Sequence, residues 1–174
     1  MVIIGENIII RAIEREDAEL LRSLINDPDT EKMLGGSSWP VSKAEQTQWI
    51  EGQFGNHPEI RRGIITLKHD NQAIGTVILS NIDQKNGTAE IHIKISKDGY
   101  RGKGLGADAI RTVVQYAFNE MRLNCIYALI LANNETSRKL FEKCGFMQEG
   151  LLKERIFKGG HYLDQLSYAI IRNK

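Results

Sequence analysis

The sequence contains few of the residues that crosslink a chain or bind metals. It has two cysteines, Cys125 and Cys144, and three prolines among 174 residues. Two isolated thiols provide neither a disulfide framework nor the spacing of a metal site. This favours a reducing compartment, with both thiols buried as small apolar groups. The four histidines are scattered without the spacing of metal ligands, so we expect no bound metal.

Long apolar runs and an excess of charge are also absent. The apolar runs, such as Leu129-Ile130-Leu131-Ala132, are far shorter than the ~20 residues that span a membrane. The first six residues have neither the basic stretch nor the apolar core of a signal peptide. A formal net charge of +1 does not suit a general nucleic-acid binder or a polybasic membrane anchor. We therefore expect a cytoplasmic protein without nucleic-acid or membrane partners.

The composition is that of an ordinary globular protein. Apolar residues make up 41% of the chain and charged residues 26%. A chain of this length falls within the size of one domain and buries roughly two thirds of its unfolded surface. Internal repeats, low-complexity tracts and linkers are absent from the sequence. We expect a single domain over residues 1–174.

Hydrophobic periodicity predicts alternating strands and helices, hence an α/β domain. The expected strands are residues 7–13, 63–68, 73–79, 88–96, 125–132, 146–157 and 162–171. The expected helices are residues 16–26, 104–121 and 135–144, and a further helix that starts at Ser42 and carries Trp49, Ile50 and Phe54. Asp27-Pro28 should stop the first helix, Ser42 and Glu45 match a capping box, and Gly145 should end the last helix.

Two of the expected strands have contrasting patterns. Residues 88–96 alternate strictly, with isoleucines on one face and Glu90, His92 and Lys94 on the other. Residues 125–132 are apolar throughout, which is typical of a central strand covered on both faces. The first strand therefore offers a polar face, and the second is expected in the core.

A glycine-rich segment connects the alternating strand to the longest helix. It reads Arg101-Gly102-Lys103-Gly104-Leu105-Gly106-Ala107. Amides at a helix start lack intrahelical partners, and glycines let backbone close around a bulky anion. Such a turn suits a phosphate or pyrophosphate, with Arg101 and Lys103 adding charge. The alternative is a turn that merely connects strand and helix.

Two other phosphate-binding motifs fit this segment poorly. A Walker A loop needs Ser or Thr after Gly-Lys, whereas Lys103 is followed by Gly104. A Rossmann fingerprint needs a third glycine where Ala107-Asp108 stands, and the strand pattern at the start of the chain is also wrong.

Taken with its surroundings, the segment resembles the GNAT N-acetyltransferases. Their signature is Arg or Gln, two residues, Gly, one residue, then Gly or Ala, and Arg101, Gly104 and Gly106 meet it. The runs 134–137 and 141–146 match as well. The closing hairpin, with Lys158-Gly159-Gly160-His161, resembles the branch of ribosomal-protein N-terminal and spermidine acetyltransferases. The strong match covers about residues 60 to 171. The resemblance implies a mixed, mostly antiparallel sheet of about seven strands flanked by helices, in the order β-α-α-β-β-β-α-β-α-β-β.

The resemblance also implies where acetyl-CoA would bind. Main-chain groups of Ile93, Lys94 and Ile95 would pair with the pantetheine arm as a short added strand. The loop from Arg101 to Ala107 would hold the pyrophosphate, and Asn134 would hydrogen-bond the pantetheine. Lys139 and Lys143 would lie near the nucleotide, with a solvated helix face as the alternative. The full set of expected cofactor residues is Ile93, Lys94, Ile95, Arg101, Gly102, Lys103, Gly104, Leu105, Gly106, Ala107, Asn134, Lys139 and Lys143.

Acetyl transfer to an amine needs a proton acceptor, because an alkyl amine with a pKa near 10 arrives protonated. Glu90 is the expected base, by its place on the polar face and by resemblance to histone-acetylating members of the superfamily. A surface or structural carboxylate is the alternative reading of Glu90, and His92 on the same face could act instead. The main-chain N–H of Ile95 is expected to stabilise the developing oxyanion.

The proton donor is less clear from the sequence. Many relatives use a tyrosine where this chain has Phe141. Ser137 is the remaining expected acid, unless it only caps or packs within its helix. The CoA thiolate could also leave without an acid, because a thiol pKa is only ~8.5.

The expected acceptor is a polyamine or another small amine, acetylated in a ternary complex. Acetylation of a protein N-terminus or lysine is the alternative, and a silent acyl-CoA-binding or sensing domain is an alternative of another class. Asp27, Asp29 and Glu31 are candidate polyamine ligands or, alternatively, solvated loop charges. A homodimer is compatible with the resemblance.

Overall fold

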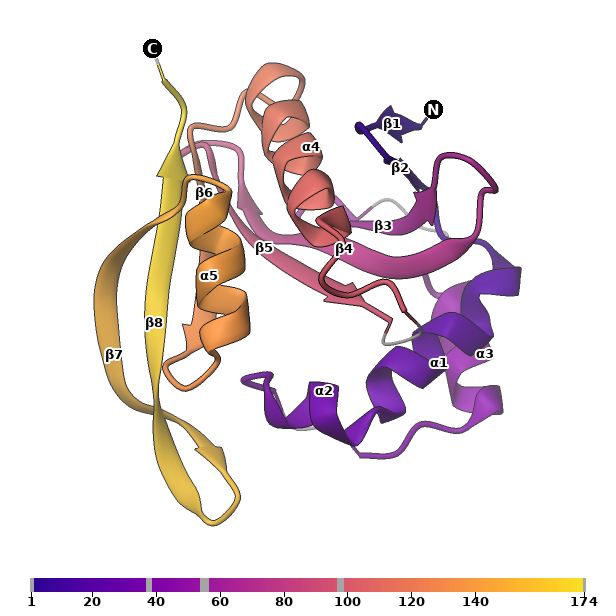
Figure 1. Cartoon of the computed structure of the whole chain (residues 1–174), viewed down its shortest axis with the longest axis horizontal. Coiled ribbons are helices and arrows are strands. Elements are labelled where there is room, and N and C mark those ends of the chain that lie inside the picture. Colours follow the sequence, from indigo (N-terminus) through magenta and orange to yellow (C-terminus); the bar gives the residue numbers. More distant parts are fainter. Residues whose placement is uncertain (1, 37–38, 54–56, 97–98, 174) are drawn as a thin grey trace.

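The computed structural model describes residues 2–36, 39–53, 57–96 and 99–173. Its centre is an eight-stranded sheet in the order β1-β2-β3-β4-β5-β6-β8-β7 (Figure 1). The strands are β1 (Ile3–Ile4), β2 (Ile8–Arg11), β3 (Arg61–Leu67), β4 (Ala73–Asp83), β5 (Thr88–Ile95), β6 (Cys125–Leu131), β7 (Met147–Lys158) and β8 (His161–Ile171). The pair β5–β6 is parallel and the other neighbouring pairs are antiparallel. The expected mixed, mostly antiparallel sheet is confirmed.

Helices cover both faces of this sheet. They are α1 (Ala18–Asn26), α2 (Pro28–Lys32), α3 (Lys43–Glu51), α4 (Leu105–Asn119) and α5 (Glu135–Lys143), with a 3₁₀ turn at Arg15–Asp17 before α1. Neighbouring residues of a strand point to opposite faces. Accordingly, Ile65 joins the core beneath α4 and α5, whereas Ile64 packs with Leu21 of α1 and Ile50 of α3.

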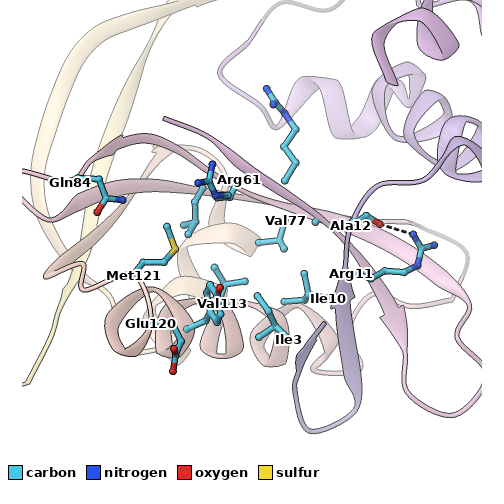
Figure 2. A pocket seen from close by; sticks show the side chains of 14 residues that line it. Ile3, Ile10, Arg11, Ala12, Arg61, Val77, Gln84, Val113, Glu120 and Met121 are labelled. Carbon is cyan, nitrogen blue, oxygen red and sulfur yellow. Dashed lines mark hydrogen bonds between the residues drawn. The ribbon is translucent and has the colours of Figure 1, made fainter. Parts of the chain in front are cut away.

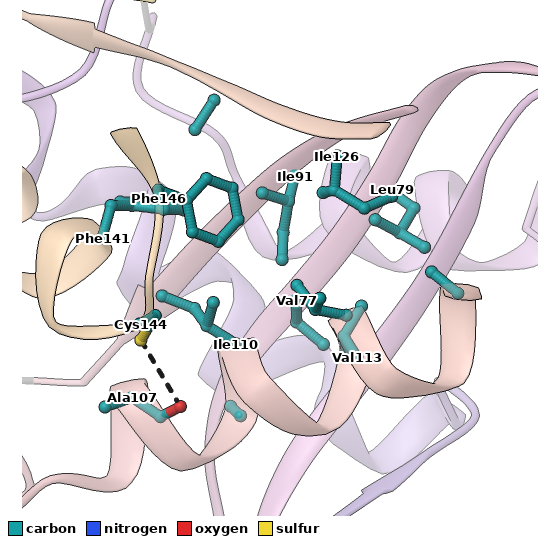
Figure 3. Packing of buried hydrophobic residues seen from close by; sticks show 14 of the residues in the cluster. Val77, Leu79, Ile91, Ala107, Ile110, Val113, Ile126, Phe141, Cys144 and Phe146 are labelled. Atoms are coloured by element: carbon teal, nitrogen blue, oxygen red, sulfur yellow. Dashed lines mark hydrogen bonds between the residues drawn. The ribbon is translucent and has the colours of Figure 1, made fainter. Parts of the chain in front are cut away.

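The larger core lies between the sheet and the helix pair α4 and α5 (Figure 3). Phe141 of α5 and Phe146 pack edge to face, with ring centroids 5.0 Å apart. The Cys144 thiol donates to the Ala107 carbonyl at 3.7 Å, and burial raises the pKa of this thiol. Burying a side chain as large as Phe contributes about 1.5–3 kcal/mol. Packing and this contact therefore hold α5 against the first turn of α4.

Several local predictions are confirmed. Ser42 Oγ accepts from the Glu45 amide at 3.2 Å, and Glu45 Oε2 accepts from the Ser42 amide at 2.8 Å, which is the expected capping box. The adjacent strands expected at 63–68 and 73–79 are β3 and β4, which pair antiparallel and are connected by residues 68–72. Gly145 follows the C-cap of α5 at φ +89°, a left-handed conformation that glycine adopts easily. Phe54, expected on the helix after Ser42, lies outside the described residues.

Two elements were not expected from the sequence, β1 and α2. The strand β1 pairs with β2, and the sheet therefore has eight strands rather than seven. The first helix does end at Asn26, but the same Asp27-Pro28 pair begins another helix. The Asp27 carboxylate accepts from the amides of Asp29 and Thr30, and proline is well suited to the first helical position. A stop signal for one helix is therefore also a start signal for the next.

The expectation that residues 125–132 are covered on both faces is wrong. In β6, Ile126, Ala128 and Ile130 are buried, whereas Tyr127 and Leu129 are partly exposed. The apolar run hides this alternation because its outer positions are also apolar. Within the described residues, no helix is long and apolar enough to cross a membrane.

Candidate active site

The two central strands β5 and β6 pair over only a short distance. Their register runs from Thr88 opposite Cys125 to Glu90 opposite Tyr127. Beyond this point β5 stays paired with β4 as far as Ile95, and β6 stays paired with β8 as far as Leu131. The sheet thus divides into two halves after the Glu90–Tyr127 pair, a place we call the fork.

Main-chain groups of β5 point alternately toward β4 and toward the fork. The Ser96 amide donates to the Ile74 carbonyl at 2.8 Å, so Ser96 faces β4. Alternation along the strand then directs the main chain of Lys94 toward β4 and those of Ile93 and Ile95 toward the fork. The Ile95 carbonyl accepts from Arg101 Nε at 3.0 Å, which agrees with that direction. Ile93 and Ile95, rather than Lys94, therefore have main-chain groups available at the fork.

The glycine loop, residues 101–107, follows β5 and starts α4. Gly102 and Gly104 have φ values of +78° and +80°, and a Cβ at either position would meet no atom within 4 Å. Backbone conformation, rather than lack of space, therefore requires these glycines. Gly104 is the N-cap of α4 and no side chain caps that helix. The amides that follow, at Leu105, Gly106 and Ala107, form a helix start suited to an anion.

The acidic residue in the first turn of α4 does not oppose this role. Asp108 is buried, and its carboxylate accepts from the amides of Glu6 at 3.0 Å and Asn7 at 2.6 Å. Its negative charge is therefore directed to the turn between β1 and β2. Lys103 is exposed and lines a hollow of about 650 Å³ together with Tyr100 and Leu105.

The helix α5 lies beside the glycine loop. A Cβ at Gly106 would stand 3.5 Å from Leu140 Cδ2, an ordinary contact that brings the two elements together. Lys139 and Lys143 lie on the exposed side of α5, and Lys139 pairs with Glu135 at 3.3 Å. The structure thus places both expected lysines on the helix next to the loop, but on its solvated face.

The side chains of Arg101 and Asn134 contact a distant part of the chain. Arg101 Nη2 donates to Thr30 Oγ1 at 2.9 Å. Asn134 caps α5 by accepting from the Ser137 amide at 3.1 Å, and its Nδ2 donates to the Met33 carbonyl at 2.9 Å. Both polar atoms of the Asn134 side chain therefore have a partner within the chain, and the contact with pantetheine stays a prediction.

A cluster of polar side chains surrounds the branching point of the sheet. Glu90 is 9% exposed, and its Oε2 accepts from Asn81 Nδ2 at 3.0 Å. Glu90 Oε1 lies 3.6 Å from His92 Nε2, which is also 2.8 Å from Ser80 Oγ. Tyr127 stands opposite Glu90 on β6. We call Ser80, Asn81, Glu90, His92 and Tyr127 the fork cluster.

The environment favours the uncharged forms of its titratable neighbours. Burial lowers the pKa of His92 below its usual 6.5, although the Glu90 carboxylate opposes this effect. Burial also lowers the pKa of Lys94 and, together with Glu90, raises that of Tyr127. At neutral pH the imidazole is therefore uncharged and the phenol protonated, so the cluster contains both a proton acceptor and a proton donor.

Three members of the cluster were missed by the sequence analysis. Asn81 sits at φ +51° in an irregularity of β4, which directs its amide to Glu90. Ser80 and Tyr127 each stand opposite Glu90, on β4 and β6 respectively. The one local signal that could have identified a missed member is the tyrosine within the apolar run 125–132. The other members come together through strand register, which the sequence does not show.

The expected acid is not joined to this cluster by any contact among the described residues. Ser137 lies in the first turn of α5, where its amide donates to Asn134. Phe141 is 4% exposed and packs on Phe146 in the main core. Glu90 and His92 are thus brought together, and Ser137 stands apart from them.

A separate cavity of about 460 Å³ lies near the other end of α4 (Figure 2). Its lining includes Ile3, Ile10, Val113 and Met121. Its lining residues come from β1 to β4 and their flanks and from the second half of α4 and the residues after it, so this cavity is not part of the fork. Among the described residues, no group of three or more His, Cys, Asp or Glu side chains is placed to hold a metal ion.

Comparisons with known proteins agree with this geometry. The family model described as "Acetyltransferase (GNAT) domain" matches residues 7–147. The "SPbeta prophage-derived uncharacterized N-acetyltransferase YokL" of Bacillus subtilis is 31% identical, over 98% of this chain and 93% of that relative. The "Putative ribosomal N-acetyltransferase YdaF" of the same organism is also 31% identical, over 98% and 94%. The solved structure of spermidine N-acetyltransferase from Vibrio cholerae in complex with CoA and spermine superposes with a TM-score of 0.86 at 27% identity, covering 95% of each chain.

Proposed function

The chain belongs to the GNAT acetyltransferase family, and we propose that it transfers acetyl from acetyl-CoA directly to a primary amine held with it at the fork. Acetyl-CoA supplies the acetyl group as a thioester. The carrying observation is the separation of β5 and β6 beside a carboxylate–imidazole pair in which the Glu90 carboxylate is buried and the His92 ring is partly exposed. Main-chain groups of Ile93 and Ile95 would bind the pantetheine arm, and the glycine loop the pyrophosphate.

Glu90 and His92 would act as a pair in removing the amine proton. An uncharged imidazole can accept a proton, and a carboxylate 3.6 Å away stabilises the imidazolium that results. Asn81 holds the Glu90 carboxylate by its 3.0 Å hydrogen bond. In this arrangement His92 would take the proton from the amine, and Glu90, the base expected from the sequence, would contribute by stabilising the imidazolium.

Proton delivery to the departing thiolate requires little help, because the thiol is a far better leaving group than an amine. Tyr127 offers a protonated hydroxyl within the fork cluster. Ser137 remains the donor expected from the sequence, and Phe141 has no hydroxyl to contribute. We therefore propose that leaving-group protonation does not limit the rate.

A polyamine or another small amine is the first acceptor that we propose. The support is the similarity to a structure of spermidine N-acetyltransferase. The acidic residues expected to bind such an acceptor have contacts within the chain: Asp27 caps α2, Asp29 lies 3.8 Å from Lys32, and Glu31 lies 2.8 Å from Lys158. A polyamine would therefore have to compete with these contacts.

A peptide N-terminus is the second candidate, and one observation favours it. The polar face beside the fork contains two cationic side chains, Arg62 and Lys94. Arg62 and the uncharged His92 both stand opposite Ile78 in the strand register, and Lys94 follows His92 by two residues on the same face. Cationic neighbours disfavour a polycation and tolerate a chain with carbonyl or carboxylate groups. The similarity to a protein named as a ribosomal N-acetyltransferase adds support.

The decisive experiment measures CoA release from acetyl-CoA with spermidine, spermine, and peptides that have a free N-terminus. Turnover of any acceptor supports the proposed transfer, and the preferred acceptor decides between the two classes. Acetyl-CoA binding by calorimetry without turnover of any amine would instead favour the silent acyl-CoA-binding domain. Absence of acetyl-CoA binding would overturn the proposed function.

A further inference from the structure

The cavity of Figure 2 lies on the face of the sheet that α4 covers, at the end of that helix away from the glycine loop. Arg61 and Gly63 of β3 stand opposite Leu79 and Val77 of β4, and all four residues line it. Its volume of about 460 Å³ falls within the range of small-molecule sites. Its lining shares no residue with the glycine loop or the fork cluster, so it is a second place where a ligand can bind.

The walls of the cavity are apolar. Side chains from three strands, from α4 and from the residue after Glu120 form them: Ile3, Ile10, Val77, Leu79, Val113 and Met121. Most of these side chains belong to the buried core, whereas Ile3 and Met121 are only partly buried. The apolar part of a ligand would lose its contact with water here, which favours binding.

Four polar side chains also line the cavity, and they do not satisfy one another. They are Arg61, Gln84, Tyr116 and Glu120. Among the described residues, the side chains of Gln84, Tyr116 and Glu120 have no hydrogen-bond or ion-pair partner. The Tyr116 side chain is half-buried, and a tyrosine hydroxyl in such a place usually finds a partner. A few polar groups around an apolar hollow are typical of a small-molecule site.

Arg61 indicates which charge the ligand has. Its Nη1 donates to the carbonyls of His57 at 2.5 Å and Ile60 at 2.9 Å. These two bonds use both protons of Nη1 and restrain the guanidinium. Nε and Nη2 have no partner among the described residues. This pair of nitrogens forms the edge of a guanidinium that can bind a carboxylate through two parallel hydrogen bonds.

The other charged residues of the lining are less suited to hold a ligand. Arg11 is paired with the Asp17 carboxylate at 2.7 Å. The Arg62 guanidinium lies 5.5 Å from the centre of the Trp49 ring, on the opposite face of the sheet. Glu120 is exposed just after α4 and would select a cation instead, an outcome that the test below separates. The cation with donors available is therefore the arginine at the start of β3.

We propose that this cavity binds a small molecule with an apolar body and a carboxylate group. The body lies against Val77 and Val113, and the carboxylate accepts hydrogen bonds from Nε and Nη2 of Arg61. The Tyr116 hydroxyl and the Gln84 amide supply further polar contacts. This inference does not rest on the proposed function, and the ligand binds together with acetyl-CoA rather than in its place.

Calorimetry with three probes that share one apolar chain tests the chemical class. The probes are octanoate, octanol and octylamine. Octanoate should bind at least about tenfold more tightly than octanol, because a guanidinium–carboxylate pair forms strong, charge-assisted hydrogen bonds. Tightest binding of octylamine would assign the selection to Glu120 and overturn the proposal. Equal binding of all three probes, or no binding of octanoate, would overturn it as well.

Variants of the lining test where the probe binds. Arg61→Gln should weaken octanoate binding at least about tenfold and leave octanol binding unchanged. Arg155→Gln, at an exposed arginine of β7, makes the same change of charge and should have no effect. Met121→Trp adds bulk to the partly buried wall and should weaken the binding of both probes. Full octanoate binding in Arg61→Gln would refute the proposed contact.

A titration of octanoate in the presence of saturating CoA separates the two sites. The affinity for octanoate should change by less than about twofold, because distant sites without shared residues act independently. Competition between CoA and octanoate would place the probe at the fork and overturn the proposal. If CoA itself does not bind, the proposed function fails, and the titrations of octanoate still decide whether the cavity is a site.

Discussion

The glycine loop and residues 27–34, which comprise α2 and its flanks, meet at Arg101 but are held in shape by different interactions. The loop is shaped locally, by the positive φ angles of Gly102 and Gly104 and by the start of α4. Residues 27–34 are held by side chains 71, 101 and 127 residues away from their partners. Changes in the loop should therefore act on cofactor binding, whereas changes in the fork cluster should act on the chemistry.

The largest expected effect separates chemistry from cofactor binding. Glu90→Gln should lower kcat by at least about a hundredfold, since a general base commonly contributes that much. Acetyl-CoA affinity should hardly change, because the glycine loop and the fork cluster share no residue. Steady-state kinetics and calorimetry provide the two measurements, with Glu120→Gln, an exposed residue beyond α4, as the control. Full activity of Glu90→Gln would show that His92 or water removes the amine proton without help from the carboxylate.

A substitution in the glycine loop should have the converse effect and weaken acetyl-CoA binding. Gly104→Val places a β-branched residue at φ +80°, and backbone strain of this kind costs about 1–3 kcal/mol. Acetyl-CoA should bind at least about tenfold more weakly by calorimetry. Gly106→Ala is the control, since its Cβ would make an ordinary 3.5 Å contact with Leu140. Unchanged affinity for acetyl-CoA in a folded Gly104→Val protein would show that the loop is not part of the binding site.

The glycine loop and the fork cluster also differ in how far the sequence predicts them. The glycine loop, the capping box at Ser42 and the alternation of β5 are local patterns, and each was predicted. The partners of Glu90 could not be predicted in the same way, because Asn81 and Tyr127 reach it through strand register. The contacts of Arg101 with Thr30 were likewise hidden, since a motif shows which residues form a loop but not which distant segment they hold.

The pH dependence of the fork cluster should be specific to His92. Its pKa is lowered in the folded protein, so the unfolded chain binds more protons and stability rises with pH. Its contribution to stability is complete above the unfolded value of 6.5 and is lost as pH falls below it. Turnover should show an acid limb in the same range, because protonated His92 cannot accept the amine proton. The pH dependence of stability, measured by urea unfolding, and that of turnover, measured by pH–rate profiles, should both weaken in His92→Gln. An unchanged acid limb in the pH–rate profile would exclude His92 as the proton acceptor.

The smallest expected effect is at Phe141. Its ring packs edge to face on Phe146 and is 4% exposed, so Phe141→Tyr adds a hydroxyl to a well-packed site. If the thiolate leaves unaided, as we propose, the rate should change by less than about threefold, against the ~10² that an effective general acid supplies. A buried hydroxyl without a partner would lower stability by about 1–3 kcal/mol, which thermal unfolding would show.

Ser137→Ala completes this comparison. Its amide contact with Asn134 survives the change, so the capping of α5 is retained and only the hydroxyl is removed. A large loss of turnover would establish serine as the acid and contradict unaided departure. Unchanged turnover in Ser137→Ala, together with no gain in Phe141→Tyr, would show that neither position on α5 takes part in proton delivery. Tyr127→Phe would then decide whether the remaining hydroxyl of the fork cluster contributes.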